Sequence, residues 1–145
     1  GCEFFLSYGM TECCGKISMS ILSKDEVRSL DVRSLLDLIC TSGRPFSLMD
    51  VKVVTSEGRI VKPDSGEVGE VLCRGSTVFD GYANNPKANK EAFTDGWFRT
   101  GDLATVNGSG YITVIDRCKD MILCGGENVY CVEVEAAEER QGSDD

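Results

Sequence analysis

"WFRTGDLATVNGSGYITVID", residues 97–116, contains two β-rich runs on either side of a turn. The runs, 97–106 and 110–116, are enriched in β-branched and aromatic residues, which favour strands. The turn between them, VNGSGY, contains Asn-Gly, a strong signal for a hairpin. The stretch therefore predicts a pair of adjacent antiparallel strands.

Further β-rich runs extend this pattern toward the N-terminus. LMDVKVV (48–54) and GEVLCRG (69–75) are separated from each other and from the hairpin by segments rich in Gly, Pro, Asn and Asp. Between residues 43 and 115 we therefore expect a small antiparallel sheet or barrel. One helix interrupts it, because Asn85 and Pro86 precede KANKEAF as an N-cap and a proline at the first helical position.

The first 43 residues have a different pattern. The apolar run Phe4-Phe5-Leu6 predicts a short buried strand, and a second apolar run follows at 17–22. In SKDEVRSLDVRSLLDLI (23–39) the apolar residues fall at helical spacing behind Ser23, a candidate N-cap with Glu26 three residues later. This segment predicts a surface helix, continuous or broken.

The composition is typical of one globular, soluble domain. The chain has 145 residues, of which 41% are hydrophobic, enough to build a core. Twenty-four acidic and fifteen basic residues give a formal charge of −9, which disfavours nucleic-acid binding by charge. No apolar run approaches the roughly 20 residues of a membrane helix, and the start shows no leader or signal segment. The start also lacks Met, as expected of a piece cut from something longer.

Eight cysteines and no histidines restrict the chemistry further. No C-x-x-C pair occurs, and a mixed Cys/His zinc site has no histidine. The cysteines are therefore interpreted as small core residues in a reducing compartment, the cytoplasm or an organelle matrix, with a disulfide or an unusual metal site as the alternative. The lack of His also removes the usual base of a Ser or Cys hydrolase. The cysteines are Cys2, Cys13, Cys14, Cys40, Cys73, Cys118, Cys124 and Cys131.

The stretch SYGMTECCG (7–15) breaks the periodicity around it. It places an aromatic ring, a glycine, a hydroxyl and a carboxylate side by side, immediately after the apolar run at 4–6. Taken alone, it is more typical of a strand-to-helix turn with an acidic cap than of a binding site.

Four short signatures in order change that interpretation: YGMTE (8–12), GWFRTGDL (96–103), DRCKD (116–120) and GGENVYCVEVE (125–135). Together with GEVLCRGSTVFDGY between the first two, they resemble the adenylate-forming (AMP-binding) superfamily, which includes acyl-CoA synthetases and coumarate:CoA ligases. The resemblance covers most of residues 5–135. It implies a two-step reaction, in which a carboxylic acid and ATP form an acyl-adenylate and pyrophosphate, and the thiol of coenzyme A then displaces AMP.

The first signature then acquires residue roles. By the resemblance, Tyr8 stacks on adenine, the Thr11 hydroxyl contacts phosphate and Glu12 holds Mg²⁺. These roles suit the residue types, because a ring offers a π face and Mg²⁺ prefers hard oxygen ligands. Gly9 and Met10 are also expected beside the nucleotide, and Gly9 would let the backbone approach it closely.

The other signatures add four expected roles. Asp102 would accept hydrogen bonds from the ribose hydroxyls, and Arg117 would reach the ribose or phosphate. Lys119 would be the hinge about which a small C-terminal domain rotates between the two steps. Gly125 and Gly126 would leave room for the pantetheine arm of coenzyme A. Taken singly, each is as well explained by a turn residue, a solvated charge or a glycine turn.

The resemblance also implies a fold, and it implies that two lysine-containing segments of the relatives fall outside these residues. The expected fold is β-rich α+β: a distorted antiparallel β-barrel subdomain (43–115) completes the end of an α/β large domain (1–115), and 116–145 hold the hinge and the start of a small C-terminal α+β domain. Relatives carry a phosphate-binding loop with a Lys before YGMTE and a catalytic Lys well beyond residue 135. Because electrostatic stabilisation dominates such catalysis, we expect the chain alone to be nearly inactive.

Two alternatives stay open. The acyl group could pass to the phosphopantetheine of a carrier protein, or to oxygen, rather than to coenzyme A. The chain could instead be a fragment that binds nucleotide or a partner without turnover, an interpretation motivated by its terminal AAEERQGSDD.

Overall fold

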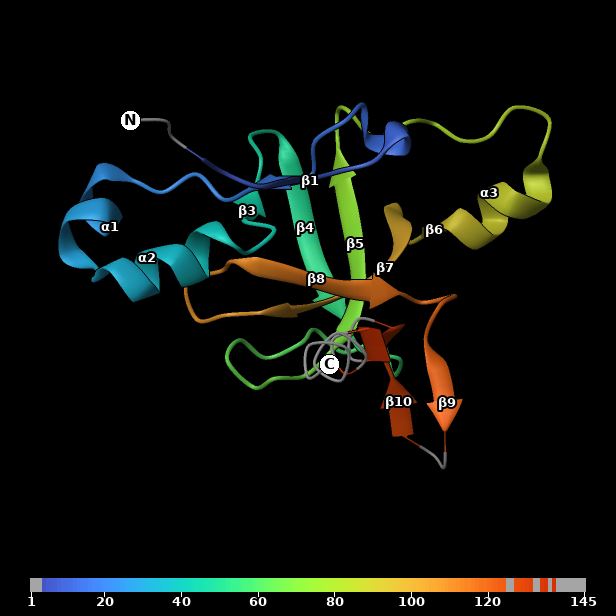
Figure 1. Cartoon of the computed structure of the whole chain (residues 1–145). Helices are drawn as coiled ribbons and strands as arrows, with labels where there is room; N and C mark the ends of the chain where they lie inside the picture. Colours follow the sequence, from blue (N-terminus) through green and yellow to red (C-terminus); the bar gives the residue numbers. More distant parts are fainter. Residues whose placement is uncertain (1–3, 125–126, 132–133, 136, 138–145) are drawn as a thin grey trace.

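A curled antiparallel sheet of five strands is the largest element of the computed structural model, which describes residues 4–124, 127–131, 134–135 and 137. Strand β4 pairs with β5 and β5 with β7, while β6 and β8 share the other edge of β7. The sheet curls into a half-barrel, so the expected β-rich α+β fold is confirmed (Figure 1). The strands are β4 (Met49–Val54), β5 (Gly69–Gly75), β6 (Phe93–Thr94), β7 (Trp97–Val106) and β8 (Ile112–Arg117).

A smaller three-stranded sheet is formed by β1 (Ser7–Tyr8), β2 (Ser18–Met19) and β3 (Arg44–Pro45), in that order. Phe4-Phe5-Leu6 is not the buried strand expected, because the strand starts at Ser7 and Phe4 is 67% exposed. The Leu6 backbone does bond to Ser20, but no described element covers the three apolar side chains. The YGMTE motif therefore begins inside a strand rather than after one.

Three short helices lie at the two sides of the half-barrel (Figure 1). Helices α1 (Lys24–Ser29) and α2 (Val32–Ile39) form the expected surface helix in its broken version, because Asp31 caps α2 by accepting hydrogen bonds from two of its backbone N–H groups. Ser23 and Glu26 form the expected capping box. Helix α3 (Pro86–Ala92) begins behind the expected Asn85 cap. None of the described helices has the length and apolar character needed to cross a membrane.

A two-stranded hairpin follows the half-barrel. Strands β9 (Ile122–Cys124) and β10 (Glu127–Val129) pair antiparallel with each other and with no other described strand. The predicted pantetheine-contacting residues Gly125 and Gly126 lie outside the described residues. The proposed domain boundary at 115/116 remains a prediction, although a change from the half-barrel to a separate hairpin follows it.

The core consists of two hydrophobic clusters. Cys13, Ile17, Met49, Cys73 and Phe98 form the first, below the YGMTE loop, and Val53, Val61, Val71, Ala104 and Ile112 form the second. Tyr8 packs against both, so the ring of the motif is anchored by the core.

The cysteines divide between core and surface. Cys13 and Cys73 are buried, as expected, with their sulfur atoms 3.4 Å apart. The expectation was wrong for Cys14 and Cys40, which are exposed. Cys14 adopts the left-handed conformation (φ 52°) at the end of a turn, and Cys40 ends the surface helix α2, so neither faces the core.

Candidate active site

The YGMTE motif folds into a closed loop between β1 and β2. Met10 is extended and precedes the single 3₁₀ turn η1 (Thr11–Cys13). The carbonyl of Met10 accepts hydrogen bonds from the N–H groups of Cys13 and Gly15, both at 3.1 Å. The backbone thus satisfies its own polar groups and leaves the exposed Thr11 side chain available to solvent or a ligand.

Gly9 is required by this loop itself. A Cβ at Gly9 would lie 1.6 Å from the carbonyl oxygen of Gly15, a distance no side chain tolerates. The sequence suggested a different reason, the approach of a nucleotide to the backbone. The structure provides an internal one, and the nucleotide contact remains a prediction.

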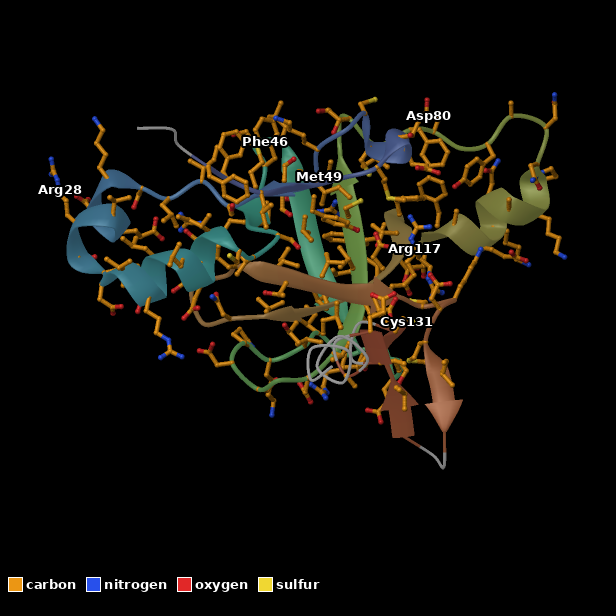
Figure 2. The ribbon with its side chains drawn as sticks, viewed as in Figure 1. Arg28, Phe46, Met49, Asp80, Arg117 and Cys131 are labelled. Atoms are coloured by element: carbon orange, nitrogen blue, oxygen red, sulfur yellow. The ribbon has the colours of Figure 1, made fainter. Side chains whose placement is uncertain are left out.

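Three of the expected residues meet at one point of the half-barrel. The Tyr8 hydroxyl donates a hydrogen bond of 2.6 Å to Oδ2 of Asp102, on β7. Nε of Arg117, directly opposite Asp102 on β8, lies 3.5 Å from its other oxygen, Oδ1. Figure 2 shows Arg117 where β8 ends, beside the sheet. Residues from three separate signatures therefore form one cluster.

The two oxygens of Asp102 are in different environments. Burial, and secondly the hydrogen bond to Asp102, raise the pKa of Tyr8 far above its usual value, so the phenol remains a donor at Oδ2. At 3.5 Å the contact of Oδ1 with Arg117 is longer than a normal hydrogen bond. Asp102 is only 8% exposed, whereas the Arg117 side chain is 72% exposed. Oδ1 therefore keeps acceptor capacity next to a positive charge that can move.

Glu12 is held from a segment that sequence reasoning did not select. The Tyr82 hydroxyl donates to Oε1 of Glu12 at 2.9 Å, and the Phe79 N–H donates to the Glu12 carbonyl at 2.8 Å. Figure 2 shows Asp80, in the same segment, beside the η1 loop. The only sequence signal for Tyr82 is its place in GEVLCRGSTVFDGY, 70 residues from Glu12. No described residue donates a hydrogen bond to Oε2 of Glu12.

This arrangement suits Mg²⁺ in one specific way. The described residues contain no group of three or more His, Cys, Asp or Glu side chains that could hold a metal by themselves. Mg²⁺, however, is commonly held by one or two carboxylates together with substrate phosphates. One carboxylate with an open oxygen meets that requirement, provided that a phosphate ligand is present.

The remaining expected residues lie at the edges of this cluster. Met10 packs against the first core cluster, and so contributes an apolar surface next to the loop. Lys119 is exposed in the turn that follows β8. The turn is held at Cys118, whose N–H donates to the Gly101 carbonyl at 2.8 Å. A hinge role for Lys119 stays a prediction.

A hollow of about 410 Å³ lies elsewhere, and its lining does not include Tyr8, Glu12 or Asp102. Its charged lining residues, Glu70 and Arg99, already form an ion pair with each other. The rest of its lining carries no charge and includes Leu72, Leu103 and Tyr130. We therefore place the candidate site at Tyr8, Glu12 and Asp102 and not in this hollow.

Comparison with known proteins gives a consistent family. The family model described as "AMP-binding enzyme" matches residues 1–83. Feruloyl-CoA synthase of Amycolatopsis sp is 41% identical over 135 residues, which are 93% of this chain and 25% of that protein. The 2-succinylbenzoate–CoA ligase of Bacillus licheniformis is 38% identical over 130 residues, 90% of this chain and 24% of that protein.

Solved structures give the same result. O-succinylbenzoate coenzyme A synthetase of Bacillus subtilis in complex with ATP and magnesium ion matches with a TM-score of 0.74 and 33% identity, over 95% of this chain and 26% of that one. McyG A-PCP complexed with phenylalanyl-adenylate matches with a TM-score of 0.69 and 31% identity, over 92% of this chain and 20% of that one. The chain thus spans a fifth to a quarter of the length of these proteins.

Proposed function

The chain belongs to the AMP-binding enzyme family, and on that premise we propose that it is part of an AMP-forming acyl-CoA synthetase, an acid–thiol ligase. The observation that carries the proposal is the Tyr8–Asp102–Arg117 cluster. Its hydrogen bond of 2.6 Å joins residues 94 positions apart, from two signatures that the family resemblance assigns to one nucleotide.

The proposed reaction has two steps. A carboxylate oxygen attacks the α-phosphorus of ATP, pyrophosphate leaves and an acyl-adenylate forms. The thiol of coenzyme A then attacks the acyl carbon, loses its proton, and AMP leaves with the electron pair of the broken bond. The substrate class is a small-molecule carboxylic acid; the names of the relatives differ in the acid, so the proposal stops at that class.

The nucleotide end of the site is where this chain contributes. Oδ1 of Asp102 would accept from the ribose hydroxyls, since Oδ2 is already occupied by Tyr8. Arg117, exposed and loosely paired, would move to the ribose or phosphate. The Tyr8 ring would stack on adenine, with Gly9 and Met10 at the same edge. Pinning its hydroxyl fixes the orientation of that ring.

The phosphate end uses the η1 loop. The Thr11 hydroxyl would donate to a phosphate oxygen, and Glu12 would hold Mg²⁺ through Oε2. Bound Mg²⁺ would neutralise charge on the transferring phosphates. In the second step, rotation about Lys119 would bring the segment around Gly125 and Gly126 to the pantetheine of coenzyme A.

A reducing compartment, either the cytoplasm or an organelle matrix, suits the thiols of this chain. The six cysteines whose side chains are described are all free. Buried Cys13 and Cys73 would act as small apolar residues there.

One comparison supports a second candidate function, in which the acyl group passes to a carrier protein. McyG A-PCP, an adenylate-bound protein, aligns with 92% of this chain at 31% identity. Coenzyme A remains the first candidate because several relatives, among them those of Amycolatopsis sp and Bacillus licheniformis, are named CoA synthases or ligases.

Nucleotide binding by the chain tests the proposal. We expect AMP to bind without Mg²⁺, and Asp102→Asn to weaken AMP at least about tenfold, as for loss of a charge-assisted hydrogen bond. The matched control is Asp50→Asn, since Asp50 pairs with Arg74 on the neighbouring strand and not with Tyr8 or Arg117, and it should leave the AMP affinity unchanged. Isothermal titration calorimetry measures the AMP affinity of the wild type and of the two variants. Absence of AMP binding, or equal affinity in Asp102→Asn, would overturn the proposal.

Catalysis is measured separately. Pyrophosphate release with ATP, Mg²⁺ and short, medium, long and aromatic carboxylic acids, beside Glu12→Ala, shows whether the chain turns over by itself. Acid-dependent release that Glu12→Ala abolishes would show that the chain is an enzyme alone. No release together with AMP binding would place the missing catalytic groups in another part of the protein.

A further inference from the structure

We propose that Tyr82 is the positioning residue for Glu12, orienting its carboxylate so that Oε2 faces Mg²⁺·ATP. The inference rests on the proposed function and adds a residue to the same site. It starts from the 2.9 Å hydrogen bond that the Tyr82 hydroxyl donates to Oε1 of Glu12. A carboxylate on a single-turn loop has freedom about its side-chain bonds, and this bond is the one described contact that restricts it.

Tyr82 is itself rigidly held by α3. Its N–H donates to Oδ1 of Asn89 at 2.7 Å, and the Asn89 Nδ2 donates back to the Tyr82 carbonyl at 3.0 Å. Gly81 adopts a φ of +141° against this amide, and a Cβ there would lie 2.9 Å from Asn89 Oδ1. The Asn89 side-chain amide therefore bonds to both the N–H and the carbonyl of Tyr82. These two bonds fix the backbone position from which the Tyr82 ring extends.

The ring is also fixed from its side. Phe79 contacts Tyr82 edge-on, with ring centroids 4.8 Å apart, and packs against the buried Phe98 at 5.3 Å. The same Phe79 donates its N–H to the Glu12 carbonyl. One segment therefore holds Glu12 by its backbone and its carboxylate together, and connects both to the core.

A phenol suits this role better than a cation. A phenol is uncharged near neutral pH, so the Tyr82 hydroxyl is a neutral hydrogen-bond donor to Glu12. An arginine in its place would neutralise the carboxylate and compete with Mg²⁺. The neutral donor restricts one oxygen while leaving the full negative charge for the metal at the other.

The chain offers a matched control in Tyr111. Its hydroxyl donates to Oε1 of Glu26 at 3.0 Å, the same chemistry away from the candidate site. Tyr82→Phe and Tyr111→Phe each remove one oxygen and one tyrosine–glutamate hydrogen bond. Only the first should change how the site uses magnesium.

The experiment is calorimetric titration of ATP into each variant at a series of Mg²⁺ concentrations, with AMP titrated without Mg²⁺ as the reference. For Tyr82→Phe we expect the Mg²⁺ concentration that gives half the maximal ATP affinity to rise about 5- to 10-fold, as for loss of one net hydrogen bond, while AMP affinity stays unchanged. For Tyr111→Phe we expect both quantities to match the wild type.

The possible results separate the two proposals. If the wild type binds no AMP, the proposed function is wrong and this inference falls with it. If AMP binds and the Mg²⁺ requirement of Tyr82→Phe equals that of the wild type, the inference alone is wrong. An equal shift in both variants would show a general loss of stability and would also overturn it.

Discussion

Two glutamates of this chain accept a hydrogen bond from a distant tyrosine at almost the same distance, yet they are in opposite situations. Glu12 accepts a hydrogen bond of 2.9 Å from the Tyr82 hydroxyl, and Glu26 accepts one of 3.0 Å from the Tyr111 hydroxyl. Glu26 also accepts from the Ser23 N–H at 2.7 Å and pairs with Arg44 at 3.1 Å. No described cation pairs with Glu12.

The difference teaches how a structural carboxylate differs from a site carboxylate. The hydrogen bonds from Ser23 and Tyr111 and the charge of Arg44 lower the pKa of Glu26 to about 2, although partial burial opposes them. Both of its oxygens are occupied: Oε1 accepts from Tyr111, just before β8, and Oε2 contacts Ser23 in the cap of its own helix and Arg44 on β3. Glu12 has one oxygen oriented and the other open. Residue type and a tyrosine partner are common to both, so the open oxygen and the lack of a described cation partner are what make Glu12, and not Glu26, the candidate metal ligand.

The largest expected effect concerns the two tyrosines, which should differ in how much they contribute to stability. Tyr111 is completely buried, whereas Tyr82 is 39% exposed. Tyr111→Ala should lower the free energy of unfolding by about 3–5 kcal/mol, as for other large buried aromatics, and Tyr82→Ala by less than about 2 kcal/mol. Urea denaturation followed by Trp97 fluorescence measures both. Equal losses of unfolding free energy would show that the two tyrosines contribute equally to stability.

The next effect concerns the loop that carries Glu12. Gly9→Ala must displace the Gly15 carbonyl, which should cost about 1–3 kcal/mol of unfolding free energy and abolish Mg²⁺-dependent ATP binding. The control is Gly96→Ala, in the β6–β7 turn, where φ is +77° but no atom lies within 4 Å of the new Cβ. It should cost about 1–2 kcal/mol and leave binding intact. Normal ATP binding by Gly9→Ala would contradict the loop geometry described above.

An acid titration sharpens the comparison at Glu26. Its pKa is about 2 in the folded chain and roughly 4.3 when unfolded, so its stabilising contribution is complete above that unfolded value and is lost as pH falls toward 2. Glu26→Gln should therefore be less stable than the wild type by about 1 kcal/mol at pH 7, and the difference should vanish near pH 2. Chemical denaturation between pH 2 and 7 measures this. A difference independent of pH would show that the charge of Glu26 is not involved.

The smallest expected effect concerns α1, which carries Glu26, and its neighbour α2. It tests whether burial of these helices contributes to stability. Neither α1 nor α2 contains a buried residue, and Leu36 on α2 is 54% exposed. Leu36→Ser should change the unfolding free energy by no more than about 0.5 kcal/mol. A thermal or urea melt that shows a loss above about 1.5 kcal/mol would mean that α2 is buried in solution, by another molecule or by another part of the protein.

Local patterns in the sequence were sufficient for the long strands of the half-barrel and for the helices. The four β-rich runs became β4, β5, β7 and β8, and the caps at Ser23 and Asn85 begin helices as expected. These signals act within a few residues, through alternation, turn chemistry and capping, so they can be read without tertiary information. The wrong expectations, the buried strand at 4–6 and the core positions of Cys14 and Cys40, concern burial, which depends on what packs above a residue.

By itself, the sequence determined the residue types of the site and their order along the chain: a ring, a hydroxyl and a carboxylate near the start, and an aspartate and an arginine near the end of the sheet. Only the tertiary structure decided that Tyr8 meets Asp102, across 94 residues, and that Tyr82 meets Glu12, across 70. The physical reason is that such contacts follow from strand register and sheet curvature, to which every pair in the ladder contributes. No local pattern encodes which oxygen of Glu12 is held and which is left open.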